Sequence, residues 1–126
     1  MKDGASARRG FRKPGALIRI VSRDYWFKPL ENHQINWCLV DDDPAAGGSI
    51  AYFFHECSGV FDRLTFVSRA AAESQLRFNG FHRLAEQPDL DQGGVPGPPF
   101  QEDQHWNGPI YSSGRFWRLA TDVPST

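Results

Sequence analysis

The segment that constrains the fold most is residues 59–84, because a helix start, a helix end and the flanking strands are all visible in it. Residues 59–67 are rich in aromatic and β-branched side chains, which favours a strand. Ser68 suits a helix N-cap, since its hydroxyl can accept a hydrogen bond from a backbone N–H one turn into the helix. Residues 69–78 are mostly strong helix formers, and Asn79-Gly80 ends the run because glycine tolerates the left-handed backbone of a helix end.

A helix of about ten residues is not stable alone in water, so it must lie on a sheet. Its apolar stripe is narrow and centres on Ala72 and Leu76. Arg69, Glu73 and Arg77 follow one another at four-residue intervals on another face, which predicts a solvated row of i,i+4 ion pairs.

Further strands are predicted on both sides of this unit. Residues 25–27 are either a short strand or a loop clamped by aromatic rings. The connections between neighbouring strands are too short for crossovers, so antiparallel pairing is expected. The sequence therefore predicts an α+β fold: a mainly antiparallel sheet of about five strands with one helix packed on one face. The remaining strands are expected at residues 16–21, 35–40, 49–56 and 115–120.

Residues 85–114 contain five prolines and several glycines, with no helix or strand pattern. A loop of this length inside one domain is usually functional or disordered. Four large apolar side chains are spaced along it, and we expect them to hold residues 98–113 against the body of the protein. These side chains belong to Phe100, Trp106, Ile110 and Tyr111.

At 126 residues the chain is predicted to form a single domain at residues 15–126, preceded by a flexible basic tail at residues 1–14. The tail carries five basic side chains against Asp3 alone, a formal charge of +4. Because the whole chain carries −1, the remainder carries −5. A basic arm can hold phosphate groups electrostatically; the alternative is a solvated tail without a special role.

No stretch is apolar for long enough to span a membrane, and the N-terminus lacks the apolar run of a signal peptide. Cys38 and Cys57 have no CxxC spacing, which favours two buried, reduced thiols of a cytosolic protein over a single disulfide. We therefore expect a cytoplasmic protein without membrane contact.

Two sets of side chains could carry chemistry. Asp41–Asp43 suggest a cation site, but consecutive carboxylates in a turn point in different directions, so a solvated turn is favoured. His55 and His82 would form a general acid–base pair if they lay within hydrogen-bond reach. The sequence leaves open whether these two, His33 or His105 are catalytic. The usual cofactor, phosphate-binding and hydrolase motifs do not occur, so no cofactor and no metal are expected, and a non-enzyme is favoured.

The strongest binding pattern lies in residues 106–118. Its aromatic rings offer faces for stacking, its serines offer hydroxyls, and its arginines offer fork-shaped donors for phosphate or carboxylate. Stacking combined with anion capture is how nucleotides and single-stranded nucleic acids are held. The alternative is that the rings belong to the core and the serines form a turn. The predicted binding residues are Trp106, Tyr111, Ser112, Ser113, Arg115, Trp117 and Arg118.

Three stretches resemble the small orphan proteins that phages, plasmids and genomic islands of proteobacteria carry: YFFHECSGVFDRL, QLRFNGFHRL and GPIYSSGRFW. The resemblance covers roughly residues 52–117 and brings no assigned activity to any residue. It implies a protein that binds a host factor, as anti-CRISPR and other anti-defence proteins do. An acidic surface fits that class, because it can occupy the nucleic-acid channel of a host protein through charge complementarity.

The leading prediction is therefore a non-enzymatic binding protein, an anti-CRISPR-like inhibitor that contacts a host protein or protein complex. The alternative is a small nucleotide-binding or nucleotide-processing protein that uses the aromatic and arginine cluster at residues 111–118. A third hypothesis is nucleic-acid binding through Arg115 and the basic tail, which predicts an affinity that falls steeply with salt.

Overall fold

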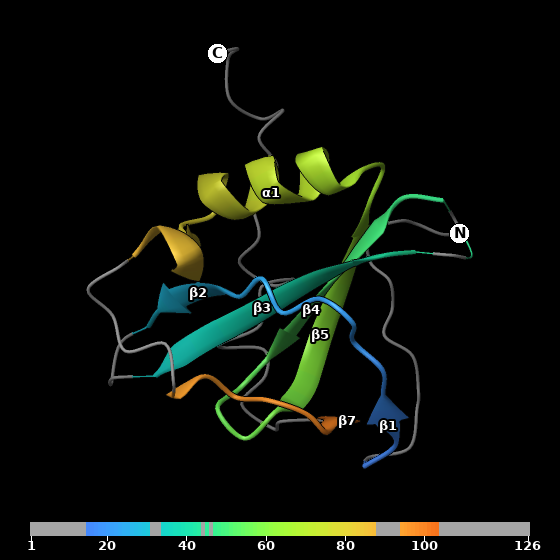
Figure 1. Ribbon diagram of the computed structural model, residues 1–126, viewed down its shortest axis with the longest axis vertical. Helices are drawn as coiled ribbons and strands as arrows, with labels where there is room; N and C mark the ends of the chain where they lie inside the picture. Colours follow the sequence, from blue (N-terminus) through green and yellow to red (C-terminus); the bar gives the residue numbers. More distant parts are fainter. Residues whose placement is uncertain (1–14, 31–33, 44, 46, 88–93, 104–126) are drawn as a thin grey trace.

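Figure 1 shows the computed structural model, which describes residues 15–30, 34–43, 45, 47–87 and 94–103. The predicted basic tail at residues 1–14 and the predicted strand at residues 115–120 lie outside these residues. The elements in chain order are β1 (Leu17–Ile18), β2 (Trp26–Pro29), β3 (Ile35–Asp42), β4 (Ser49–Phe54), β5 (Gly59–Phe66), α1 (Arg69–Phe78), β6 (His82–Arg83), η3 (Leu84–Glu86) and β7 (Phe100–Glu102).

The strands of the described part form one sheet in the order β1-β7-β5-β4-β3-β2-β6. The three long strands β3, β4 and β5 form an antiparallel meander at its centre, in which Cys38 lies opposite Phe53 and Phe53 lies opposite Asp62. Strand β7 pairs antiparallel with β1 and parallel with β5, while every other pair in the described residues is antiparallel. The predicted α+β fold, with one helix and a mainly antiparallel sheet, is confirmed.

The predicted number of strands is wrong, because the sheet has seven strands rather than about five. Strands β1 and β6 have two residues each, and β7 has three. Segments this short cannot show an alternation of apolar and polar side chains. They become strands only because segments from elsewhere in the chain supply hydrogen-bond partners: β7 for β1, β2 for β6, and both β1 and β5 for β7. Strand β7 also lies inside residues 85–114, where no regular structure was expected.

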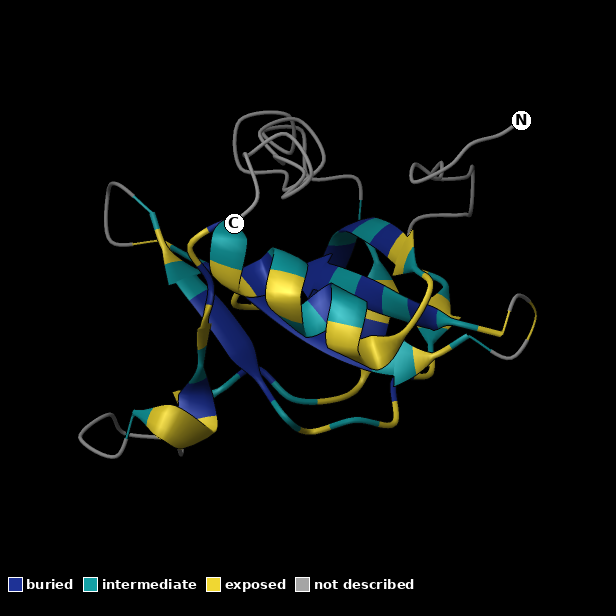
Figure 2. Ribbon diagram, turned by 90° about the horizontal axis from the view of Figure 1, so that it is seen from above, coloured by how far each residue is buried: buried dark blue, intermediate teal, exposed yellow. Residues whose placement is uncertain are grey.

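Helix α1 begins and ends where the sequence predicts. The Ser68 hydroxyl accepts a hydrogen bond from the Ala71 backbone N–H at 3.0 Å, and Gly80, just beyond the end of the helix, has φ of 90°. Ala72 and Leu76 are fully buried against the sheet, and Figure 2 shows the strands buried beneath the helix. This face of the core also contains Trp26, Cys38, Val40, Ala51, Phe53, Leu64 and Phe81.

The two arginines of the predicted row of ion pairs have close partners outside the helix. The Arg69 guanidinium donates to the Val40 carbonyl at 2.9 Å, and Arg77 binds the carboxylate of Glu86. Both arginines thus bind partners outside the helix, on β3 and η3, because tertiary neighbours offer a carbonyl or a two-oxygen acceptor at short range.

The opposite face of the sheet is also buried in the described part of the chain. Residues 18–25 and 95–100 lie over it and contribute aromatic and branched side chains. The rings meet edge to face, with centroids 5.0 Å apart for Phe54 and Phe100 and 6.0 Å apart for Tyr25 and Trp37. The buried members of this cluster are Ile20, Tyr25, Phe27, Trp37, Leu39, Phe54, Val60, Leu84 and Phe100.

Replacing Phe100 by alanine is expected to lower the free energy of unfolding by about 3–5 kcal/mol, because the ring is 2% exposed and its removal leaves a cavity. Denaturant unfolding followed by circular dichroism measures the change. Val67→Ala serves as the control, since Val67 is 86% exposed and its change should stay within about 0.5 kcal/mol. Equal effects of the two substitutions would contradict this account of the second face.

Candidate functional site

The seven predicted binding residues, in the range 106–118, all lie outside the described residues, so their role stays a prediction. The structure does describe residues 94–103, which lead directly into that range. Residues 98–103 belong to the stretch, residues 98–113, that was expected to be held against the body by its own large side chains. Phe100 confirms this for its part of the segment, because its ring is buried in the core.

Polar contacts hold the same segment from two sides. The Tyr25 hydroxyl donates to the Pro96 carbonyl at 2.8 Å, and the Ser58 hydroxyl donates to the Gly97 carbonyl at 2.5 Å. Burial raises the pKa of Tyr25 above its ordinary value, so the phenol keeps the proton with which it donates. The chain therefore enters β7 in a defined position.

The end of β7 is also held in place, by contacts with residues of β5. The Asp103 backbone N–H donates to the Val60 carbonyl at 2.9 Å, and the Arg63 guanidinium donates to the Glu102 carboxylate at 2.5 Å. The Arg63 guanidinium also lies 5.5 Å from the centre of the Tyr52 ring. Both members of the Arg63–Glu102 pair are mostly buried, so this ion pair is screened less by solvent than a surface pair.

A histidine–carboxylate pair lies where the β4–β5 turn meets the end of β7. His55 Nε2 is 2.6 Å from Asp103 Oδ2, and His55 Nδ1 accepts a hydrogen bond from the Cys57 backbone N–H at 3.0 Å. Because Nδ1 accepts, it carries the lone pair, and the ring proton lies on Nε2 and points at Asp103. The arrangement fixes both the tautomer and the orientation of the imidazole.

Because Gly59 has no side chain, it leaves room for the His55–Asp103 pair. A Cβ atom at residue 59 would lie 2.5 Å from Asp103 Oδ2 and would also overlap His55 Nε2. The residue before it, Ser58, adopts φ of 66°, which turns the chain sharply into β5. The sequence marked this CSG stretch only as a break between strands.

The structure does not bring His55 and His82 together. His82 pairs with Phe27, Phe27 pairs with Trp37, and Trp37 pairs with Phe54, the residue before His55. Three strand spacings, roughly 14 Å, therefore separate the two histidines. The His82 ring packs on Phe27 with centroids 5.5 Å apart, so the predicted acid–base pairing of His55 with His82 is wrong. His33 and His105 lie outside the described residues.

The acidic run at the end of β3 serves the fold. The Asp41 carboxylate accepts hydrogen bonds from the backbone N–H groups of Val21 and Ser22 at 2.7 and 2.8 Å. Asp42 pairs with an arginine of α1, and Asp43 accepts a hydrogen bond within the β3–β4 turn. The three carboxylates thus bind different partners. The predicted turn is wrong for Asp41 and Asp42, because both residues belong to β3 and pair with β4. In the described ranges no three His, Cys, Asp or Glu side chains are grouped so that they could hold a metal ion.

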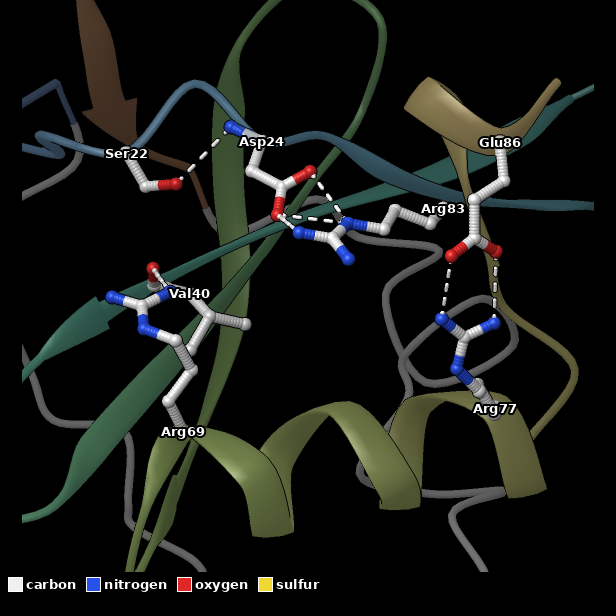
Figure 3. Close-up of polar contacts among 7 residues, drawn as sticks. All are labelled: Ser22, Asp24, Val40, Arg69, Arg77, Arg83 and Glu86. Carbon is white, nitrogen blue, oxygen red and sulfur yellow. Dashed lines mark hydrogen bonds and ion pairs between the residues drawn. The ribbon is translucent and has the colours of Figure 1, made fainter.

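A second polar cluster surrounds Trp26, which is 1% exposed. The guanidinium carbons of Arg77 and Arg83 lie 5.0 and 5.8 Å from the centre of its ring. Glu86 binds Arg77 with both oxygens at 3.0 and 2.9 Å, and Asp24 binds Arg83 with a shortest distance of 2.6 Å (Figure 3). Hydrogen bonding to Arg77 lowers the pKa of Glu86, and hydrogen bonding to Asp24 raises the pKa of Arg83. Because these contacts join α1, η3, β6 and β2, the cluster stabilises the fold.

The two cysteines differ in their environment. Cys38 is fully buried in β3, and burial raises the pKa of its thiol well above the ordinary value. Cys57 is exposed on the β4–β5 turn, and both thiols are free. The prediction of two buried thiols is therefore correct for Cys38 and wrong for Cys57. A residue in a sharp turn beyond the end of a strand has no sheet to cover it.

Comparison with known proteins adds no relative, since no family model, no curated protein and no solved structure matches this chain. Among the described residues, no helix is both long and apolar enough to cross a membrane.

Gly59→Ala is expected to destabilise the protein, because the added methyl group displaces Asp103 or His55 and disturbs the pairing of β5 with β7. Thermal unfolding measures the effect. Gly94→Ala is the matched control, since a Cβ atom there meets nothing within 4 Å. A melting temperature of Gly59→Ala equal to that of Gly94→Ala would contradict the close approach described above.

The Glu86–Arg77 pair predicts a pH dependence of stability. Because the pKa of Glu86 is lowered in the native state, the pair stabilises the protein above the ordinary pKa of a carboxyl group. The stabilisation by the pair is lost as the pH falls from the ordinary pKa of a carboxyl group through the lowered pKa of Glu86 in the native state. Denaturant unfolding between pH 7 and pH 3 is therefore expected to show the wild type losing its advantage over Glu86→Gln as the pH falls.

The control for this experiment is the same substitution in an Arg77→Gln background. Without Arg77, the carboxyl group loses the largest cause of its lowered pKa. Glu86→Gln should then change stability by nearly the same amount at both ends of the pH range. A wild-type advantage that grows as the pH falls would contradict the assignment.

Proposed function

We propose that this protein is a non-enzymatic binding protein that acts by contact with another protein. Its recognition surface is the segment that follows β7, with Trp106, Tyr111, Arg115 and the neighbouring predicted binding residues as its contacts. The observation that supports this best is the way residues 94–103 are held. A segment of this composition would otherwise remain a solvated loop.

The contacts of residues 94–103 bear directly on binding. The Pro96 and Gly97 carbonyls accept hydrogen bonds from Tyr25 and Ser58, and Phe100 is buried. Strand β7 then pairs with a strand on each side. A recognition segment that starts from a fixed point loses less conformational entropy when it binds, and so binds more tightly for the same contacts. Trp, Tyr and Arg are the residue types that contribute most to protein–protein interfaces.

The charge distribution supports a protein partner with a basic surface. Residues outside the N-terminal tail carry a formal charge of −5. Within the described residues, several arginines are already bound to carboxylates of the same chain, as in the Arg63–Glu102, Arg77–Glu86 and Arg83–Asp24 pairs. Host proteins that act on nucleic acids present basic channels, and an acidic protein complements them. The anti-CRISPR-like inhibition implied by the family resemblance belongs to this proposal.

The test is affinity capture from a proteobacterial lysate with the wild type and with Trp106→Ala and Arg115→Ala. Both substitutions are expected to abolish capture of a specific protein while the melting temperature stays within a few degrees, because they remove interface contacts only. Quantitative mass spectrometry of the captured proteins gives the readout. Arg19→Ala is the matched control, since it removes an exposed arginine from the β1 end of the sheet.

Two results would overturn the proposal. A collapse of the melting temperature in Trp106→Ala or Arg115→Ala would assign these side chains to the core. Unchanged capture by both variants would remove the segment from the interface. Retention of the wild type on immobilised nucleotide, lost in Arg115→Ala, would instead support the nucleotide-binding alternative.

A further inference from the structure

The outer edge of strand β5 is open along most of its length, and this feature is independent of the binding function proposed above. Strand β7 pairs with β5 at Gly59 and Val60, whereas β5 continues to Phe66. Figure 1 shows β7 beside the start of β5, while the rest of β5 rises toward α1. Among the described residues, no strand pairs with residues 61–66 on the side of β5 that faces away from β4.

The hydrogen-bond pattern shows which backbone groups face this edge. At the start of β5 the Ser58 and Val60 carbonyls accept hydrogen bonds from β7, so alternate residues face outward. The register shift opposite the end of β4 inserts one residue into β5 and moves this alternation by one. Beyond the shift, the backbone groups of Arg63 and Thr65 therefore face the open edge.

Two further observations agree with an open edge at these residues. The Arg63 backbone N–H donates to the side-chain carboxylate of Asp62 at 2.9 Å, so a side chain takes the place of a neighbouring strand there. Thr65 is exposed, and Val67, which follows β5 directly, is 86% exposed. The edge therefore presents the N–H and C=O groups of Thr65 to solvent, beside an exposed apolar side chain.

An open edge of this kind binds an extended strand, because a strand offers donors and acceptors at matching intervals. The side chains fit a second copy of this chain. In an antiparallel pair with its twofold axis at Thr65, this threonine faces its own copy, and Arg63 faces Val67 of the second copy. A threonine pair is favourable at such a position, and no like charges lie directly opposite each other.

Other registers of the two copies fit less well. A twofold axis at Arg63 would place two guanidinium groups directly opposite each other, which is unfavourable. Registers shifted toward the start of β5 bring the second copy against Asp103, whose backbone N–H already binds the Val60 carbonyl. We therefore propose that two copies of this chain associate through the open edges of β5, antiparallel, with Thr65 on the twofold axis. The two sheets then form one continuous sheet.

Size-exclusion chromatography with light scattering tests the association on the full chain, from micromolar to millimolar concentration. The wild type is expected to shift from monomer to dimer as its concentration rises. Thr65→Lys and Thr65→Glu should each weaken the dimer about tenfold, because each places like charges opposite each other at the axis. An equal mixture of Thr65→Lys and Thr65→Glu should regain the dimer, since opposite charges then meet. Ser74→Lys, on the exposed side of α1, should dimerise as the wild type does.

Cross-linking tests the register. Thr65→Cys is made in a Cys57→Ser background, because Cys57 is exposed, whereas Cys38 is fully buried and cannot react between copies. The Cα atoms of a hydrogen-bonded antiparallel pair lie about 5.5 Å apart, which a disulfide can span. Mild oxidation is therefore expected to link two copies of Thr65→Cys. Ser74→Cys in the same background should stay unlinked.

A wild type that stays monomeric at the highest concentration would overturn the proposal. A dimer that Thr65→Lys leaves unchanged, or equal linkage of Thr65→Cys and Ser74→Cys, would do the same. A monomeric wild type whose capture of another protein is lost in Thr65→Lys would assign the edge to a strand of that protein instead. Circular dichroism reports whether each variant is folded. Dimerisation and partner capture are measured separately, so either can fail without the other.

Discussion

The hydrogen bonds of strand β7 are the connection on which one side of the sheet depends, because in the described residues β1 pairs only with β7 and reaches the central strands only through it. Its pairing with β1 attaches the first described residues to the sheet, and its parallel pairing with β5 attaches them to the central meander. Phe100, from the same three residues, packs its ring on Phe54 in the core of the second face. Backbone pairing and ring burial thus act together at one short segment.

The two faces of the sheet are covered in different ways, which explains where function can reside. Helix α1 covers one face with a narrow apolar stripe of small and medium side chains. The other face is covered by side chains from the irregular segments at residues 19–25 and 95–99 and by the ring of Phe100 from β7. Irregular coverage needs polar contacts for its own backbone, and Asp41, Tyr25 and Ser58 provide them. Hydrogen bonds therefore hold these irregular segments in place, as they hold the strands.

Asp103 contacts both the β4–β5 turn and strand β5. It ends the described part of the segment that leads into the predicted binding residues, and it also orients His55 on the β4–β5 turn. The contact between β7 and the turn is possible only because Gly59 has no side chain.

The sequence by itself determined the features that depend on neighbouring residues: helix α1 with its Ser68 cap and Gly80 end, the three long strands, and the mainly antiparallel α+β fold. Only the tertiary structure decided strand β7, the pairing of Arg69 and Arg77 outside the helix, and the meeting of His55 with Asp103, 48 residues apart. The physical reason is the distance along the chain over which each kind of interaction acts. Capping, helix propensity and alternation act within a few residues, whereas ladder hydrogen bonds and charge-assisted contacts join groups whose positions are fixed only once the sheet has formed.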